Sequence, residues 1–410
     1  MRIKIDHIAR VEGHIGFVAN ILKNDIKKAR IEVLEGARLI EGLLIGRSYD
    51  EAPIITSRIC GICPTVNNIT SIKAMEAALD IKPNQATQDL RKILLWAQVI
   101  QSHALHFFFL STGDFLGIKN DLELIKKHPG LTKKAILLRD FANRLIEIIA
   151  GRAIHPLTTC VAGFRKAPNQ REIDDLMKKY PEVLNAMIDL TNFFIKLDYT
   201  DFSRKTEYIA LSKLNEYAIY DGDIKTTDKK LVPEEIFIKD IGEIQKPYQV
   251  VKRAEYNGEA FMVGALARLN LQYDLLNPKA KDLLSKTGMS LPNYNSIRNV
   301  LAQVIEVVHA LEEIKKLMKT DFSRINLNPR VYLKPGYGVG ATEAPRGTLY
   351  HAYQIDKKGI IRNANVITPT AQFLANLEED LKVLLNGTHD EDKIKMMIRA
   401  YDPCISCATH

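Results

Sequence analysis

Cysteine is scarce in this sequence, and several features that mark common protein classes are missing. Five of the 410 residues are cysteine, which is too few for a disulfide-built secreted scaffold. No stretch approaches the roughly 20 uninterrupted apolar residues that a membrane span needs, and even the one at 104–112 is short and interrupted by His106. The N-terminus, from Met1 to Asp6, lacks the apolar core of a signal peptide. We therefore expect a cytoplasmic protein without a membrane span.

A dense basic stripe is also missing. The net charge of +8 comes from 57 lysines and arginines against 49 acidic residues, and the lysines are scattered along the chain. Nucleic-acid binders concentrate such charge and interleave it with aromatic residues, so we expect no nucleic-acid partner. Hydrophobic residues make up 46% and charged residues 26%, as in ordinary globular proteins, so the whole chain should fold.

The pattern of apolar residues predicts an α+β protein. Alternation predicts strands within residues 1–35, and helical spacing predicts helices over most of 67–197. Further predictions are short mixed elements at 205–260 with a strand at 248–251, and helices at 297–318, 371–385 and 390–401. The segment at 335–347 is rich in glycine and proline. Repeats are absent. We expect one intertwined unit over 1–410, with long helices packed against small antiparallel sheets.

Four of the five cysteines form two Cys-x-x-Cys pairs near opposite ends of the chain. Cys60 and Cys63 lie in the run Arg-Ile-Cys-Gly-Ile-Cys-Pro, just before a predicted helix whose free N–H groups and positive end favour thiolates. Cys404 and Cys407 lie in Asp-Pro-Cys-Ile-Ser-Cys-Ala-Thr-His, which ends at His410. In a cytosolic protein such pairs indicate metal or redox chemistry.

Four thiolates suit zinc, an Fe–S cluster, or nickel with iron. A four-cysteine zinc site is the commonest use of two such pairs, although a zinc ribbon usually has its second pair within a few tens of residues. On spacing alone these metals stay open. The fifth cysteine, Cys160, has no neighbouring cysteine and is expected to be a small buried apolar residue.

The two motifs together resemble the signatures of [NiFe] hydrogenase large subunits. Further matches are Arg-Val-Glu-Gly-His at 10–14, Glu-Ala-Pro-Arg-Gly at 343–347 and Thr-Pro-Thr at 368–370, so the resemblance covers almost the whole chain. It implies that family's α+β fold, which the quinone-site subunit of respiratory complex I shares. It also implies the catalytic subunit of an enzyme that cleaves H2 reversibly and heterolytically.

The resemblance implies specific roles for the four cysteines. Cys60 and Cys404 would be terminal nickel ligands, while Cys63 and Cys407 would bridge nickel to an iron that carries cyanide and carbon monoxide. Maturation would need nickel-insertion proteins and a protease that trims the chain after the motif's histidine. Because the sequence ends at His410, it is expected to be the mature form.

By the same resemblance, Glu12 is the carboxylate that relays protons near the sulfur of Cys407. Proton transfer needs a group that both accepts and releases a proton, and glutamate can do so. On the sequence alone, Glu12 could instead be a surface carboxylate paired with Arg10.

Arg346 resembles the arginine whose guanidinium lies over the open metal position, where its planar fork donates to cyanide. Asp114 and Asp402 match carboxylates that hold this arginine, and Thr370 matches a hydroxyl that donates to the other cyanide. Two alternatives stay open: Arg346 could simply pair with Glu343, and Asp402 could cap its own turn.

Glu41 and His410 match the ligands of a second metal, usually magnesium, although Glu41 could equally be a solvated helix residue. His14, His103 and His106 are expected to be hydrogen-bonded network residues rather than ligands.

One residue departs from the family pattern. Relatives usually carry histidine four positions after the second cysteine of the first pair, where this chain has Asn67. The Asn67 amide can still donate a hydrogen bond near a bridging thiolate, but it cannot titrate.

Electrons must leave through another polypeptide, because Cys160 alone cannot hold an Fe–S cluster. The resemblance implies a small subunit with Fe–S clusters, and further electron-transfer subunits that reach NAD(P), deazaflavin F420 or a similar carrier. Three rivals remain: a zinc-stabilised interaction subunit without activity, a subunit of an energy-converting membrane complex, and a quinone-site subunit, although the last lacks the four thiolates.

Overall fold

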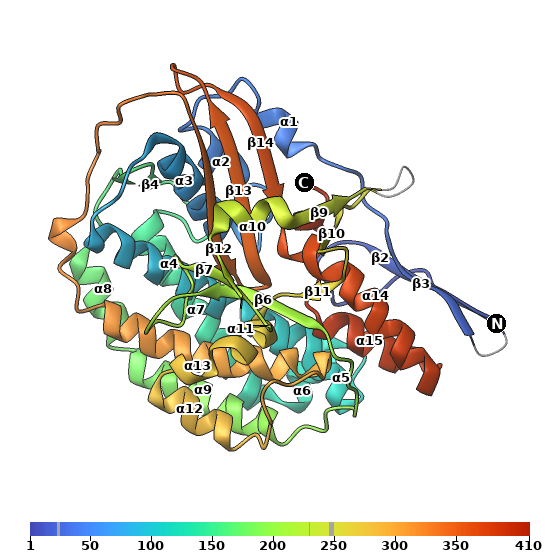
Figure 1. The fold of residues 1–410 in the computed structure, drawn as a ribbon. Helices are drawn as coiled ribbons and strands as arrows, with labels where there is room; N and C mark the ends of the chain where they lie inside the picture. Colours follow the sequence, from blue (N-terminus) through green and yellow to red (C-terminus); the bar gives the residue numbers. More distant parts are fainter. Residues whose placement is uncertain (23–24, 229, 246–249) are drawn as a thin grey trace.

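The computed structural model describes residues 1–22, 25–228, 230–245 and 250–410. It consists of long helices and small sheets, so the predicted α+β class is confirmed. Many of the helices gather in one layer in the lower part of the view, the three-stranded sheet lies above them with other helices beside it, and the C-terminal helices lie to one side (Figure 1). A single hydrophobic cluster runs from Ile3 near the N-terminus to Ala408 near the C-terminus.

The helical layer is built on α4 (Gln85–Ala104), which continues through a π-helical turn (Leu105–Ser111) into α5 (Thr112–Leu116). Against it pack α7 (Pro129–Ala150) and α13 (Asn299–Leu317), and α9 (Tyr180–Ile195) packs against both of these. The sequence predicted these helices from apolar residues at helical spacing. In α4 and α13 nearly every side of the helix is buried, because other helices surround them.

The stretch Gln85–Leu116 is long and apolar enough to cross a membrane by length and composition. The sequence predicted no stretch that could span a membrane, and this finding corrects that expectation. However, 83% of the most apolar part of this stretch is buried inside the fold, as in the core helix of a globular protein. A single such helix among the described residues is weak support for a membrane span.

The predicted strands near the N-terminus form an antiparallel sheet of β1 (Arg2–Ile5), β2 (Ile15–Leu22) and β3 (Asp25–Val33). Inward-facing Ile5, Phe17 and Ile31 are buried. This sheet packs on α14 (Pro369–Gly387) through β3. The loop between β1 and β2 is thereby held next to the C-terminal segment.

The Gly- and Pro-rich segment at 335–347 forms the first strand of a three-stranded antiparallel sheet and the turn that follows it. The strands are β12 (Gly336–Ala344), β13 (Gly347–Ile355) and β14 (Ile361–Ile367). Gly336, Gly338 and Gly340 alternate along β12 and face α3 (Pro64–Leu79). A Cβ at Gly338 would lie 2.1 Å from the backbone nitrogen of Ala78. The glycines therefore allow β12 to lie directly on α3.

The predicted strand at 248–251 falls partly outside the described residues, because Tyr248 and Gln249 are not described. Val250 and Val251 are not in a strand, and the next one begins at Arg253.

The remaining α-helices are α1 (Ile40–Leu44), α2 (Ala52–Thr56), α6 (Asp121–Lys127), α8 (Gln170–Met177), α10 (Glu234–Asp240), α11 (Ala265–Gln272), α12 (Pro278–Ser285), α15 (Glu391–Ala400) and α16 (Ile405–Ala408). The remaining strands are β4 (Thr159–Cys160), β5 (Gly163–Phe164), β6 (Glu207–Ser212), β7 (Asp223–Thr226), β8 (Leu231–Val232), β9 (Ile241–Ile244), β10 (Arg253–Tyr256) and β11 (Phe261–Met262).

The contact between β12 and α3 can be tested with a single methyl group. We expect Gly338→Ala to lower the free energy of unfolding by about 1–3 kcal/mol, because the new Cβ collides with helix backbone that cannot move aside. Gly242→Ala in β9 is the matched control, since its Cβ would meet nothing closer than 3.9 Å. Urea unfolding of both variants measures the effect, and equal stability would contradict the proposed close approach.

Candidate metal centre

The four paired thiols converge although the two pairs are 344 residues apart. Cys60 and Cys63 end the loop before α3, and Cys404 and Cys407 lie at the start and inside of α16. The Sγ atoms of Cys60 and Cys404 are 3.3 Å apart, those of Cys63 and Cys407 are 3.2 Å apart, and all four lie within 4.8 Å of one another. All four residues are buried.

Hydrogen-bond donors surround the sulfurs. The backbone N–H of Ile62 donates to Cys60 Sγ over 3.3 Å, and the Asn67 side-chain amide donates to Cys63 Sγ over 3.5 Å. The amide donor that the sequence predicted at Asn67 is therefore in place. Such donors stabilise thiolates relative to thiols.

The thiols cannot all ionise together without a cation. Hydrogen bonds from Cys404 and then Cys407 hold the pKa of Cys60 well below its usual value, whereas burial raises the pKa of Cys404 well above it. Ionisation of one thiol therefore makes ionisation of the neighbouring thiols less favourable. A soft cation bound between the sulfurs removes this conflict, which makes the donor set suitable for nickel.

A small cavity lies on one side of the thiol cluster. Of the four cysteines, Cys63 and Cys407 line it. The other lining residues are Val66, Asn67, Ala344, Pro345, Arg346, Leu349, Pro369 and Thr370. A closed four-sulfur zinc site needs no such space. With a volume of about 10 Å³, the cavity leaves room for about one water-sized group beside Cys63 and Cys407.

Arg346 lies in the turn between β12 and β13 and is almost fully buried. Its Nε donates to the carbonyl of Asp402 over 2.8 Å, and its Nη2 donates to Asp402 Oδ1 over 2.7 Å. Burial lowers the pKa of Arg346, but Asp402 and the nearby sulfurs outweigh burial and raise it well above its usual value. The guanidinium is therefore permanently charged beside the cavity. The alternative pairing with Glu343 is wrong, because Glu343 pairs with Arg268.

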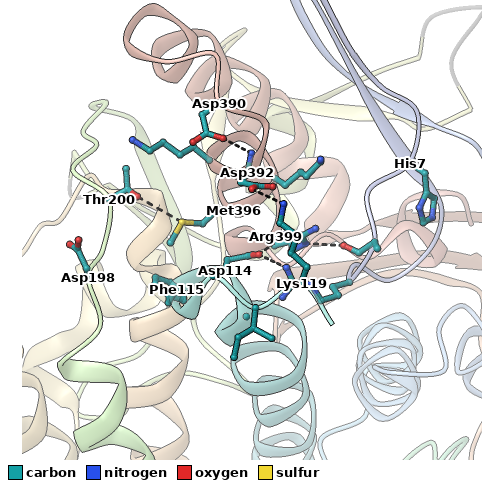
Figure 2. A pocket seen from close by; sticks show the side chains of 17 residues that line it. His7, Asp114, Phe115, Lys119, Asp198, Thr200, Asp390, Asp392, Met396 and Arg399 are labelled. Atoms are coloured by element: carbon teal, nitrogen blue, oxygen red, sulfur yellow. Dashed lines mark hydrogen bonds and ion pairs between the residues drawn. The ribbon is translucent and has the colours of Figure 1, made fainter. Parts of the chain in front are cut away.

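The expectation that Asp114 supports Arg346 needs correction. Asp114 accepts hydrogen bonds from Arg10 and Arg399, and it lines a separate cavity of about 490 Å³ (Figure 2). The second partner of Arg346 is the hydroxyl of Ser102 on α4, which accepts from Nη1 over 3.2 Å. Sequence analysis missed Ser102 because a lone serine within a long apolar helix carries no motif.

Thr370 also lines the small cavity, from the first turn of α14. Its hydroxyl oxygen accepts from the backbone N–H of Cys404 over 3.1 Å. The hydroxyl hydrogen is therefore available for a ligand in the cavity.

Glu12 lies in the loop between β1 and β2 and forms an isolated parallel bridge with Cys404. Its carboxylate accepts from the backbone N–H of Ser406 over 2.9 Å and from the Ser406 hydroxyl. Arg10 pairs with Asp114, so the alternative of a surface pair between Glu12 and Arg10 is wrong. Glu12 is half-buried beside the second cysteine pair.

The side chains of Glu41 and of His410, the last residue of the sequence, lie close together. His410 Nε2 is 4.0 Å from Glu41 Oε1 and 2.8 Å from the carbonyl oxygen of Val366. Lys252 lies 3.2 Å from Glu41 and 3.4 Å from Glu243. Two carboxylates therefore face one ammonium group.

The other singled-out histidines lie in hydrogen-bond networks or at the surface. His103 contacts Glu306 over 2.7 Å, and His106 contacts Gln303 and the carbonyl of Arg399. His14 is exposed, which sequence analysis did not anticipate.

Cys160 is only half-buried, and burial raises the pKa of its thiol.

Comparisons with known proteins agree on one family. The family model described as nickel-dependent hydrogenase matches residues 38–137 and 196–410. The chain is 33% identical to the alpha chain of sulfhydrogenase 1 from Pyrococcus furiosus, over 100% of this chain and 97% of that protein. It is 31% identical to a component of the F420-non-reducing hydrogenase vhu from Methanocaldococcus jannaschii, over 93% and 98%. A solved NAD⁺-reducing [NiFe]-hydrogenase in the H2-reduced state matches with a TM-score of 0.90 at 26% identity, over 100% of this chain and 99% of that chain.

Replacing one thiolate at a time tests the metal centre. We expect Cys60→Ser and Cys404→Ser each to abolish nickel binding, because a neutral hydroxyl replaces a soft anionic ligand. Cys160→Ser is the control and should keep its nickel. Elemental analysis of the purified proteins gives the answer, and a full equivalent of nickel in either of the first two variants would contradict this ligand set.

Proposed function

The chain belongs to the nickel-dependent hydrogenase family and is an oxidoreductase acting on H2, and on that premise we propose that it cleaves H2 reversibly and heterolytically at a nickel–iron centre. The single observation that carries this proposal is the convergence of four buried thiols beside a cavity and a buried guanidinium. A structural metal site would need the thiols alone.

Cys60 and Cys404 would hold nickel alone, and Cys63 and Cys407 would hold both nickel and an iron with cyanide and carbon monoxide ligands. The position of the cavity beside Cys63 and Cys407 supports this division. When bound, the nickel–iron group supplies the site at which H2 is polarised and split.

Arg346 and Thr370 act on the contents of the cavity through directed hydrogen bonds. The guanidinium fork is fixed at one end by Asp402 and at the other by Ser102, so its charge has a fixed position at the cavity. A preorganised charge in a site without water costs no reorganisation during reaction. The Thr370 hydroxyl oxygen accepts from the backbone N–H of Cys404, which leaves its hydrogen to donate to a ligand in the cavity.

Glu12 accepts the proton that is released at the sulfur of Cys407 and passes it outward. Its support is its place beside Ser406, the residue before Cys407, in a half-buried loop that joins the interior to the surface. The contact with the Ser406 N–H holds the carboxylate at this place.

Glu41 and His410 hold a magnesium ion together with the carbonyl of Val366. The two carboxylates, Glu41 and Glu243, exceed the charge of Lys252 by one negative unit, which suits a small hard cation. Burial lowers the pKa of His410, which favours the neutral ring that a metal ligand requires. Its Nδ1 lies 2.6 Å from the carbonyl oxygen of Cys407, so Nε2 is the nitrogen that would face the ion. This metal stabilises the C-terminal segment that carries Cys404 and Cys407.

Electrons pass to a small subunit with Fe–S clusters, because one remaining cysteine, Cys160, cannot hold a cluster. Further electron-transfer subunits reach the soluble carrier, and a maturation protease and nickel-insertion proteins assemble the centre. The three relatives are named sulfhydrogenase, F420-non-reducing and NAD⁺-reducing. The carrier therefore depends on the partner subunits rather than on this chain. A cytoplasmic location is part of the same proposal.

Metal analysis with infrared spectroscopy tests the proposal as a whole. We expect nickel and iron in the purified complex, together with infrared bands of metal-bound cyanide and carbon monoxide. Zinc in place of both metals would identify a non-catalytic interaction subunit. If the cysteines hold no metal at all, the result would point to a quinone-site subunit.

Substitution of Glu12 tests the mechanism as opposed to the metal content. We expect Glu12→Gln to keep the nickel and the infrared bands but to lose about a hundredfold or more in both H2 oxidation and H/D exchange, because glutamine cannot relay a proton. Glu35→Gln is the matched control, since Glu35 is a half-buried carboxylate that accepts from the backbone N–H of His14 in the same loop. Normal rates in both assays would remove Glu12 from the proton path.

A further inference from the structure

A second buried arginine, Arg268 on α11, contacts the turn that carries Arg346. It pairs with Glu306 of α13 and Glu343 of β12, and the side chains of all three are at most 2% exposed. Glu306 also accepts from the Tyr217 hydroxyl over 2.9 Å and contacts His103 over 2.7 Å. We call these five residues the Arg268 cluster.

Arg268 uses every donor of its guanidinium. Two hydrogen bonds, from Nε and Nη2, go to Glu306 over 2.6 Å each, and one from Nη1 goes to Glu343 over 2.7 Å. The two remaining N–H groups donate to the carbonyls of Ala344 over 2.9 Å and Pro345 over 3.0 Å. These carbonyls belong to the two residues immediately before Arg346. A planar fork with five fixed partners defines the position of this backbone in all directions.

The other side of the turn is also tightly packed. Gly264, which precedes α11, has a φ of +113°, and a Cβ there would lie 3.0 Å from the carbonyl oxygen of Arg346. Residues before and within α11 therefore contact both sides of the turn. Ser102, the second partner of the Arg346 guanidinium, is next to His103 of the Arg268 cluster.

We propose that Arg268, held between Glu306 and Glu343, is a positioning residue that sets the place of the Arg346 guanidinium over the metal centre. This inference rests on the proposed function. A buried ion pair gives little net stability compared with well-packed apolar residues of the same volume. The use of a guanidinium here is explained by the two carbonyls of the turn, which apolar side chains could not hold.

The protein contains a matched comparison for this role. Arg91 is also fully buried, pairs through two nitrogens with Glu76, and donates to a backbone carbonyl, that of Cys160. Its partners lie outside the turn of Arg346. Arg91→Lys and Arg268→Lys therefore make the same chemical change in buried ion pairs. Arg268 has two carboxylate partners and Arg91 has one, and of the two arginines it is Arg268 that contacts the turn.

The experiment compares these two variants, and Arg346→Lys as a benchmark, in the complete complex. It measures nickel and iron content, thermal unfolding, H2-dependent dye reduction at several H2 concentrations, the infrared bands of the cyanide ligands, and a crystal structure of each variant. We expect Arg268→Lys to keep its metals but to turn over about tenfold to a hundredfold more slowly than Arg91→Lys, because a displacement near 1 Å can cost this much. Its cyanide bands should shift toward those of Arg346→Lys, and its crystal structure should show Arg346 displaced from Asp402. Arg91→Lys should change stability alone.

Several results decide against the proposal. Turnover of Arg268→Lys within about threefold of Arg91→Lys, a barrier change of about 0.7 kcal/mol, with Arg346 in place, would overturn it. If Arg268→Lys does not fold, Glu306→Gln compared with Glu76→Gln decides by the same criteria. If the parent complex lacks nickel or H2 activity, the proposed function fails. The position of Arg346 in the crystal structures then still tests the inference.

Discussion

Four thiolates within 4.8 Å of one another repel unless a cation lies between them, and the rest of the molecule is arranged around this requirement. The two ends of the chain each bring one pair, so the site forms only when the fold is complete. Glu12 and Cys404 form a β-bridge, and Arg399 donates to the carbonyl of Ala9 over 2.8 Å, which fixes the N-terminal loop to the C-terminal segment. Metal binding and folding of both ends are therefore coupled.

The second requirement is a rigid platform beside the sulfurs. Alternate glycines allow β12 to lie on the backbone of α3, the helix that begins directly after Cys63. The hairpin from β12 to β13 is thereby fixed relative to the first cysteine pair, and Arg346 lies at its turn. Close backbone packing is rigid because it contains no side chains that can change rotamer. The glycine pattern and the metal site are in this way parts of one arrangement.

Buried charges complete the site in two layers. Asp402 and Ser102 hold the Arg346 guanidinium directly, and Arg268 holds the backbone from which it projects. Each buried charge has a partner at hydrogen-bond distance, as the low dielectric of the interior demands. Asp114 has a different role. It accepts hydrogen bonds from Arg10 and Arg399 and thereby joins the N-terminal loop to α15.

The sequence by itself determined the parts of this protein that depend on local pattern or on motif. Apolar periodicity predicted the long helices and the N-terminal sheet, and the two cysteine motifs identified the thiols and the family. Tertiary structure alone decided which partners meet. It assigned Ser102 instead of Asp114 to Arg346, and it turned the glycine-rich segment of Gly338 into a strand. A motif records residues that are near in sequence, whereas a strand packed on a helix, or a serine facing an arginine 244 residues away, depends on distances that only the folded chain sets.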